Sequence, residues 1–175
     1  MHADLATALG SSPAPSGYLD VLADAMHRRL TEVLEQVPEV TPYSDELRAA
    51  FDAVRGLEGP VPVQQIHGDL HLGQVLVRGD DFVIIDFEGE PARPLFERRA
   101  KSSPVRDVMG MVRSFDYAPE VVLRDPAFAE NHAGDAAALQ VWATLWKQEV
   151  TAAYVGAYLA TVKGAPFLPS DPHQL

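Results

Sequence analysis

The 175-residue chain contains no cysteine, so disulfide frameworks and thiolate metal sites are excluded. It is also poor in positive charge: 14 Lys and Arg residues stand against 25 Asp and Glu residues, and the formal net charge is −11. Nucleic-acid binding depends on phosphate contacts from a basic surface, so we expect no nucleic-acid partner. The net charge still allows a local cationic or Mg²⁺-filled site for a phosphorylated ligand.

Long apolar runs are absent as well. No segment approaches the roughly 20 apolar residues of a membrane-spanning helix, and residues 1–20 lack the basic start and apolar stretch of a secretion signal. We therefore expect a cytoplasmic protein without membrane contact. A composition of 47% apolar and 22% charged residues suits a packed core, and the length suits one domain rather than two.

The segment 10–17, rich in glycine, serine and proline, forms the clearest break in the chain. It predicts a partial helix and linker over 1–17, followed by one lobe over 18–175. After the break, apolar residues recur at spacings of three and four, which predicts a helix whose inner face contains Leu19, Leu22, Met26, Leu30, Val33 and Val37. A second helix is expected to begin at Thr41 and Pro42 and to end at Gly56.

Short β-type runs follow at 63–66, 74–77 and 82–85, and the last two flank a hairpin turn at 78–81. The segment 88–103 has no clean period and predicts a loop. A further helix is expected to begin at Ser103-Pro104, with an inner face of Val105, Val108, Met109, Val112 and Phe115. A last helix is expected over 135–163. The predicted fold is mainly α with a small β-hairpin, an α+β class.

Three oxygen-bearing side chains gather around the predicted hairpin. Asp69 follows a short strand in a glycine-flanked loop, Gln74 begins the next strand, and Asp86 ends the hairpin. An amide and a carboxylate suit Mg²⁺, which takes few protein ligands and keeps water and phosphate oxygens. A separate carboxylate nearby can orient an attacking hydroxyl for phosphoryl transfer. Taken singly, each Asp is more often a turn or capping residue; the joint arrangement is less ordinary.

These residues lie in longer strings that resemble a known family. The strings are His67-Gly-Asp-Leu-His-Leu-Gly-Gln74, Asp86-Phe-Glu-Gly-Glu-Pro-Ala-Arg-Pro94 and the segment 103–117. They resemble the aminoglycoside-phosphotransferase-like kinases, and more specifically the actinobacterial maltokinases; the related glucosamine kinases share much of the pattern. The resemblance implies the C-terminal lobe of the protein-kinase-like fold.

The resemblance also implies roles for individual residues. Asp69 would be the catalytic base, and Gln74 and Asp86 would hold Mg²⁺ on the phosphates of ATP. The wider superfamily has Asn where this chain has Gln74, whereas the maltokinase-like branch has Gln. Asp107 would anchor the backbone of the catalytic loop; its alternative is to complement the dipole of its helix.

Six residues are candidates for substrate contact: His67, Glu88, Arg93, Glu149, Tyr154 and Tyr158. The resemblance implies that His67 organises the loop. Glu88 and Arg93 have a solvated salt bridge as their alternative. Glu149 shares a predicted inner face of the last helix with two tryptophans, where a carboxylate needs a polar partner. An aromatic wall with a carboxylate suits a sugar, although core packing also explains the tryptophans.

The second lobe expected of such a kinase has no counterpart in the sequence. The three lysines, Lys101, Lys147 and Lys163, all follow the catalytic motif, and no glycine-rich loop precedes it. The sequence thus predicts part of an ATP-dependent sugar kinase that is incomplete alone. Maltose, phosphorylated to maltose 1-phosphate, is the first-choice substrate and glucosamine the second. The alternative is a non-catalytic domain that binds a sugar or a partner. A separate N-terminal lobe or self-association is the expected protein contact.

Overall fold

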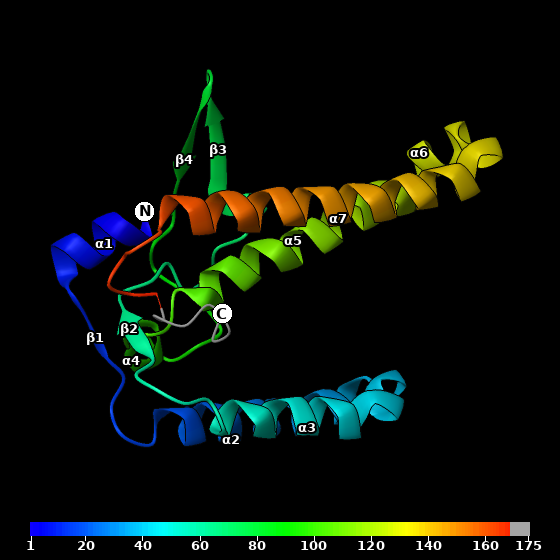
Figure 1. The fold of residues 1–175 in the computed structure, drawn as a ribbon. Coiled ribbons are helices and arrows are strands. Elements are labelled where there is room, and N and C mark those ends of the chain that lie inside the picture. The colour runs from blue at the N-terminus through cyan, green and yellow to red at the C-terminus, as the bar shows by residue number, and fades with distance from the viewer. Residues whose placement is uncertain (169–175) are drawn as a thin grey trace. The chain divides into compact units, whose positions relative to one another are not determined.

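The computed structural model describes residues 1–168 and consists mainly of helices, with two small two-stranded sheets (Figure 1). Residues 169–175 of the predicted lobe lie outside the described residues. The chain divides into two compact units. Unit 1 contains Met1–Ser12 and Pro62–Leu168, and unit 2 contains residues 13–61. The chain therefore passes between the units within the segment 10–17 that the sequence marks as a break. Within residues 1–168, no helix is long and apolar enough to cross a membrane.

Unit 2 is a helical hairpin. Helix α2 (Tyr18–Gln36) and helix α3 (Ser44–Arg55) are joined by the 3₁₀ helix η1 (Pro38–Tyr43). The expected start of the second helix at Thr41 was wrong, because residues 38–43 with both prolines form the 3₁₀ turn before the α-helix begins at Ser44. The two helices are also joined by ion pairs. Arg55 contacts Asp20, Asp24 and Asp52, and Asp52 also pairs with His27.

Unit 1 begins with helix α1 (His2–Leu9). Strand β1 (Ser11–Pro13) follows, ends at the first residue of unit 2 and pairs with β2 (Pro62–Gln64). After the short 3₁₀ helix η2 (Leu72–Gln74), strands β3 (Val75–Arg78) and β4 (Asp81–Ile84) form the predicted antiparallel hairpin. Its register pairs Val75 with Ile84 at the base and Arg78 with Asp81 at the tip. The hairpin projects away from the long helices of this unit (Figure 1).

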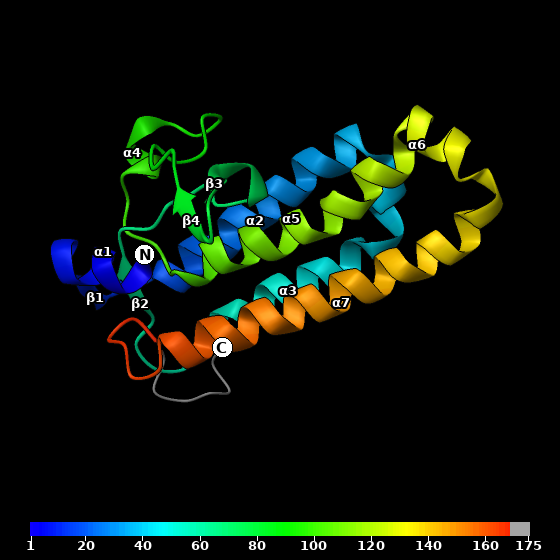
Figure 2. The same ribbon diagram turned by 90° about the horizontal axis from the view of Figure 1, so that it is seen from above.

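The rest of unit 1 is helical. Helix α4 (Leu95–Arg98) lies in the segment expected to be a loop, so that expectation was wrong for these four residues. Helix α5 (Val105–Arg124), helix α6 (Pro126–Asn131), the 3₁₀ helix η3 (Ala133–Asp135) and helix α7 (Ala136–Thr161) follow. Helices α5 and α7 lie side by side in both views (Figures 1 and 2).

The core that positions the candidate site lies between the loop after β2 and helix α5. Leu70, Met111 and Phe115 form a buried cluster, and partly buried Val75, Ile84 and Tyr154 pack against it. The inner face of α5 contains Asp107, Val108, Met111, Ser114 and Phe115. Met109, expected on that face, is instead 54% exposed, because the buried stripe runs through Val108 and Met111 rather than through Met109. Val105 is exposed for the same reason.

Candidate active site

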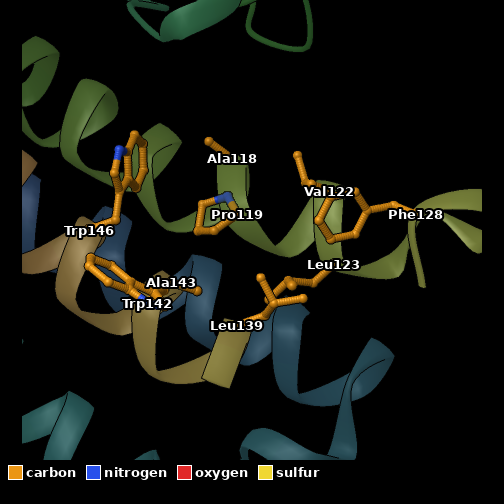
Figure 3. Close-up of a pocket in the computed structure, with 9 residues that line it drawn as sticks. All are labelled: Ala118, Pro119, Val122, Leu123, Phe128, Leu139, Trp142, Ala143 and Trp146. Carbon is orange, nitrogen blue, oxygen red and sulfur yellow. The ribbon is translucent and has the colours of Figure 1, made fainter. Parts of the chain in front are cut away.

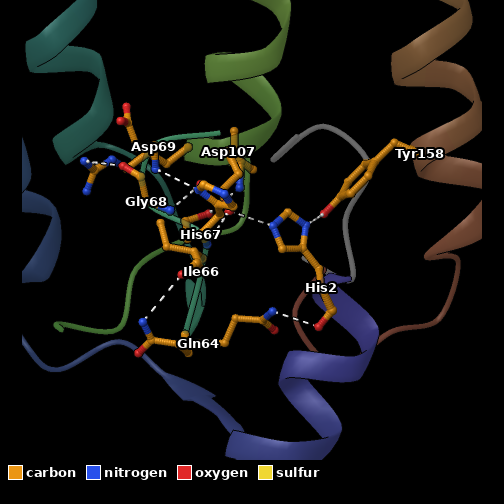
Figure 4. A network of polar contacts seen from close by, with 12 residues as sticks. His2, Gln64, Ile66, His67, Gly68, Asp69, Asp107 and Tyr158 are labelled. Atoms are coloured by element: carbon orange, nitrogen blue, oxygen red, sulfur yellow. Dashed lines mark hydrogen bonds and ion pairs between the residues drawn. The ribbon is translucent and has the colours of Figure 1, made fainter. Parts of the chain in front are cut away.

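The buried carboxylate of Asp107 holds the loop that carries Asp69. Asp107, on the first turn of α5, is 1% exposed. Its Oδ2 accepts the backbone N–H of His67 at 2.7 Å, and its Oδ1 accepts that of Gly68 at 2.8 Å (Figure 4). A carboxylate with backbone donors on both oxygens fixes the peptide units that it binds. This is the anchoring geometry that the family resemblance implies for Asp107.

The ring of His67 connects this loop to the end of the hairpin. Its Nδ1 accepts the backbone N–H of Asp69 at 3.3 Å, and its Nε2 donates to the carbonyl of Ile85 at 2.7 Å. The two partners require the tautomer with the proton on Nε2. His67 is almost fully buried and packs against Phe87. Both ring nitrogens are occupied inside the protein, which favours the role of organising the loop over contact with a sugar.

Asp86 stands directly after this anchored carbonyl and has an unusual backbone conformation. Its φ is 63°, the only positive φ of a non-glycine residue within residues 1–168. Such a conformation is strained for most side chains and is tolerated best by Asn and Asp. Its Oδ2 accepts a hydrogen bond from Nε2 of Gln74 at 3.1 Å. The hairpin thus brings together two side chains that are twelve positions apart.

The donor set of Gln74 and Asp86 fits Mg²⁺. An amide oxygen and a carboxylate are hard ligands, and Asp86 is exposed to solvent, so water and phosphate oxygens can complete the coordination of the ion. Within the described part of the chain there is no group of three or more His, Asp or Glu residues arranged to enclose a metal. A protein-only cage is therefore absent from residues 1–168, whereas a site completed by a phosphorylated ligand matches these two residues.

A second polar group lies on the other side of the loop and was missed by sequence reasoning. Arg106 donates from Nη2 to the carbonyl of Gly68 at 3.2 Å and lies 3.6 Å from a carboxylate oxygen of Glu90. Glu90 also pairs with Arg93 at 2.6 Å, and Arg93 lies 3.5 Å from Glu97. Arg93 therefore forms the loop salt bridge that was its alternative. Glu88 is exposed.

The three candidates on α7 differ in their surroundings. Glu149 is exposed, so the expectation of a carboxylate on an inner face was wrong; Trp142, on the same predicted face, is 69% exposed. Tyr154 packs edge-on against Phe115, with 5.5 Å between the ring centroids. Burial raises the pKa of Tyr154, and the charge of Asp107 raises it further.

The side chain of Tyr158 is directed toward His2 on helix α1 (Figure 4). Its hydroxyl lies 2.9 Å from Nδ1 of His2. Burial is the main cause that raises the pKa of Tyr158, followed by the neighbouring Tyr154 and Asp107. The contact with His2 favours a structural role for Tyr158, and its contact with a sugar stays a prediction.

His2 was not recognised from the sequence. Its Nε2 lies 3.0 Å from Oδ2 of Asp107, from which it is separated by 105 positions. No spacing rule connects a histidine on a short helix to a carboxylate so far along the chain. The burial of His2 on α1 would have indicated this contact. The mixed composition of residues 2–9 does not reveal that burial.

An apolar groove lies elsewhere in unit 1, between α5, α6 and α7 (Figure 3). It has a volume of about 370 Å³, and its lining includes Pro119, Phe128, Trp142 and Trp146. None of the polar residues described above lines it. The groove and the carboxylate chemistry are thus separate features of this unit.

Comparisons with known proteins point to one group. No family model matches the chain. The chain is 32% identical over 131 residues to a glucosamine kinase of Streptacidiphilus jiangxiensis, a match that covers 70% of this chain and 29% of that protein. It is 38% identical over 81 residues to a glucosamine kinase of Mycolicibacterium smegmatis, covering 46% of this chain and 20% of that protein.

Solved structures agree with the sequence matches. A glucosamine kinase in complex with glucosamine, ADP and inorganic phosphate superposes with a TM-score of 0.78 and 26% identity. The superposition covers 92% of this chain and 37% of that chain. A second crystal form is matched with the same TM-score over 96% of this chain and 41% of that one. The chain thus spans less than half the length of these relatives. The likeness is to glucosamine kinases and gives no support to maltose as the substrate.

Proposed function

We propose that this chain is the catalytic part of an ATP-dependent sugar kinase whose substrate is glucosamine or a closely related amino sugar. One observation supports this most: Gln74 and Asp86 meet at 3.1 Å beside a loop that is anchored by Asp107. This arrangement occurs in a chain that is similar in sequence and in fold to segments of glucosamine kinases. In this proposal Gln74 and Asp86 are the Mg²⁺ ligands, and Asp69 is a separate carboxylate that acts on the sugar.

Each residue has a defined part in the proposed reaction. Gln74 and Asp86 would hold Mg²⁺, which neutralises charge on the phosphates of ATP when it is bound. Asp69 orients the attacking hydroxyl of the sugar and takes its proton. Asp107 and Arg106 hold the peptide units of His67 and Gly68, which fixes the backbone just before Asp69. Accurate placement of the base matters because small displacements of reacting groups cost large factors in rate.

The preference for glucosamine over maltose rests on the relatives and on charge. Glucosamine carries an ammonium group at neutral pH, which a carboxylate can receive. Glu88, two residues after Asp86, and Glu149 on α7 are exposed carboxylates in unit 1 and are the candidates for this contact. Tyr154 supports the loop from the core, through Phe115 and Leu70. A nucleotide-covering lobe, supplied by more of the same protein or by a partner, completes the site in this proposal.

A paramagnetic ion tests the metal assignment on the chain itself. Mn²⁺ replaces Mg²⁺ at oxygen sites and broadens nearby amide resonances in NMR spectra. With Mn²⁺ and ADP, we expect selective broadening at residues 69, 74 and 86. Asp86→Asn should raise the Mn²⁺ concentration required by about 10-fold or more, because a first-coordination-sphere carboxylate is lost. Asp80→Asn, in the exposed turn of the same hairpin, is the matched control. Broadening that is insensitive to Asp86→Asn would contradict the proposal.

A further inference from the structure

We propose that His2 is a positioning residue for the catalytic loop: together with Tyr158 it fixes the carboxylate of Asp107, and through Asp107 the peptide units before Asp69. The contacts themselves are independent of any reaction. Their importance for catalysis rests on the proposed function. The proposal assigns a role at the candidate site to helix α1, which has no residue among the expected metal ligands or substrate contacts.

The geometry forms a continuous chain of hydrogen bonds across three helices (Figure 4). The hydroxyl of Tyr158 on α7 lies 2.9 Å from Nδ1 of His2 on α1. Nε2 of His2 lies 3.0 Å from Oδ2 of Asp107 on α5. The same oxygen accepts the backbone N–H of His67, and the other oxygen accepts that of Gly68. His2 is 4% exposed, so water does not compete for either ring nitrogen.

The chemistry of the partners sets the direction of each bond. An ionised carboxylate only accepts, so Nε2 of His2 carries the proton that is donated to Asp107. The proposal assigns one proton to the ring, so that Nδ1 is an acceptor and the hydroxyl of Tyr158 is its donor. Burial raises the pKa of Tyr158, which keeps its phenol protonated and able to donate. Both ring nitrogens of His2 are therefore used, and the tautomer is fixed by its neighbours.

The consequence for the loop follows from the burial of Asp107. A buried carboxylate is stable only where hydrogen bonds replace its hydration. Asp107 has three such bonds in this network, two from the loop and one from His2. Without the donor on His2, Asp107 keeps only the two bonds from the loop amides, so one of the three contacts that hold the carboxylate in its orientation is lost.

The position of His2 is itself held by contacts that do not involve the loop. Its backbone carbonyl accepts a hydrogen bond of 2.9 Å from the buried side chain of Gln64. Its ring meets the rings of Tyr158 and Phe167 edge-on, with centroid distances of 5.6 and 6.2 Å. Farther along α1, Ala6 packs against Val162 and Phe167. The imidazole is thus oriented by contacts other than the one with Asp107, as expected of a group that imposes geometry on its partner.

Amide hydrogen exchange measured residue by residue by NMR tests the proposal. In His2→Phe, which keeps a ring but removes both nitrogens, exchange at His67 and Gly68 should accelerate by about 5- to 10-fold, the factor expected for one buried hydrogen bond. Amides of helix α2, in the other unit, should be unchanged. His2→Gln, whose side-chain amide can donate to Asp107, should restore most of the protection. Tyr154→Phe, one turn from Tyr158 and without an assigned hydroxyl contact, is the control for exchange.

The imidazole nitrogens provide an independent readout. Long-range ¹H–¹⁵N spectra at neutral pH should show His2 protonated on Nε2 alone. Tyr158→Phe should shift the Nδ1 resonance and leave the proton on Nε2. Unchanged amide exchange at His67 and Gly68 in His2→Phe would overturn the proposal. If His2→Phe does not fold, the test is Tyr158→Phe. Unchanged amide exchange together with an unchanged Nδ1 resonance in Tyr158→Phe would then overturn the proposal. A proton on Nδ1 would overturn the assignment of Tyr158 as donor. No sugar or nucleotide is required, so these results and the Mn²⁺ experiment can fail independently.

Discussion

At the scale of single residues, the site depends on close approach as much as on charge. Gly110 on α5 faces the loop so closely that a Cβ atom there would lie 2.6 Å from the carbonyl oxygen of Leu70. That distance is too short for any real contact with carbon. The helix can therefore support the loop that carries Asp69 at this point only because residue 110 has no side chain.

We expect Gly110→Ala to destabilise the protein by about 1–3 kcal/mol, as other overpacking substitutions do, and to shift the amide resonances of residues 69–72. The matched control is Gly156→Ala on α7, where an added Cβ meets no atom within 4 Å. There the better helix propensity of alanine should stabilise by up to about 1 kcal/mol. Urea unfolding measures the change in the free energy of unfolding in each variant. Equal changes would show that the loop moves to accommodate the side chain at position 110 at no cost in stability.

Substitutions of Asp69 and of Asp86 should have different effects on phosphoryl transfer and on nucleotide affinity. In an enzyme reconstituted with a nucleotide-covering lobe, Asp69→Asn should reduce phosphoryl transfer by about 100-fold or more and leave nucleotide affinity nearly unchanged, because Asp69 acts on the sugar hydroxyl. Asp86→Asn should weaken both. Single-turnover rates and nucleotide dissociation constants measure this. An equal loss of nucleotide affinity in both variants would show that the roles are assigned wrongly.

The strained conformation of Asp86 gives a stability prediction that is separate from catalysis. Asn tolerates a positive φ nearly as well as Asp, whereas a β-branched residue does not. Asp86→Asn should therefore leave the free energy of unfolding within about 0.5 kcal/mol, and Asp86→Val should lower it by about 1–3 kcal/mol. Thermal unfolding of the two variants provides the measurement. A similar loss in both would mean that the side-chain contact with Gln74, rather than the backbone, sets the stability.

At the scale of elements, the regular pattern in the sequence predicted most of the fold. Periodicity located the long helices, and the turn at 78–81 located the hairpin. The prediction of inner faces failed where burial does not follow the periodicity, because Met109 and Trp142 are apolar but exposed. The pairing of Gln74 with Asp86 was predictable because a hairpin has a fixed register. The contacts of Asp107 with His2 and of Arg106 with Gly68 were not, since they join separate elements through tertiary packing.

The α2–α3 hairpin should respond to acid through Arg55. The hydrogen bond and charge of Arg55 lower the pKa of Asp24, and the hydrogen bond from His27 is the largest cause that lowers the pKa of Asp52. A lowered carboxyl pKa stabilises the folded state above the ordinary pKa of about 4, and this contribution is lost as the pH falls through the lowered value.

Arg55→Met should therefore flatten the decrease in stability of unit 2 below about pH 5. Amide exchange in α2 and α3 between pH 3 and pH 6 measures this, corrected for the intrinsic pH dependence of exchange. The control is Arg29→Met, which removes an exposed pair with Glu32 on α2 alone. The same flattening in both variants would show that Arg55 has no special part in joining the helices.

At the scale of the whole molecule, several apolar side chains are open to solvent. On the hairpin, Val77 and Phe82 face each other across the strands and are 74% and 67% exposed. The tryptophans of the groove are exposed as well. Exposed apolar patches of this kind favour association with another surface. The self-association expected from the sequence can therefore be tested on this surface.

The chain alone should accordingly not phosphorylate glucosamine or maltose with ATP and Mg²⁺, because one wall of a nucleotide site leaves the transferring phosphate open to water. Light scattering should give a solution mass above the 19.0 kDa of one chain. Replacing Val77 and Phe82 by serine should lower that mass toward the monomer. Robust turnover by a monomer would contradict the prediction of incompleteness and support the assignment as a sugar kinase.

The hydrogen bonds of His2 also determine when the site can form during folding. They join residues separated by 105 and 156 positions along the sequence. Contacts of such long range form late, after the local helices and the hairpin. On a ribosome, His2 emerges early and must wait for α5 and then α7 before its two partners exist. The hydrogen-bond network that runs from Tyr158 through His2 to Asp107 can therefore be completed only after synthesis has reached Tyr158, and its completion is a late event rather than a local one.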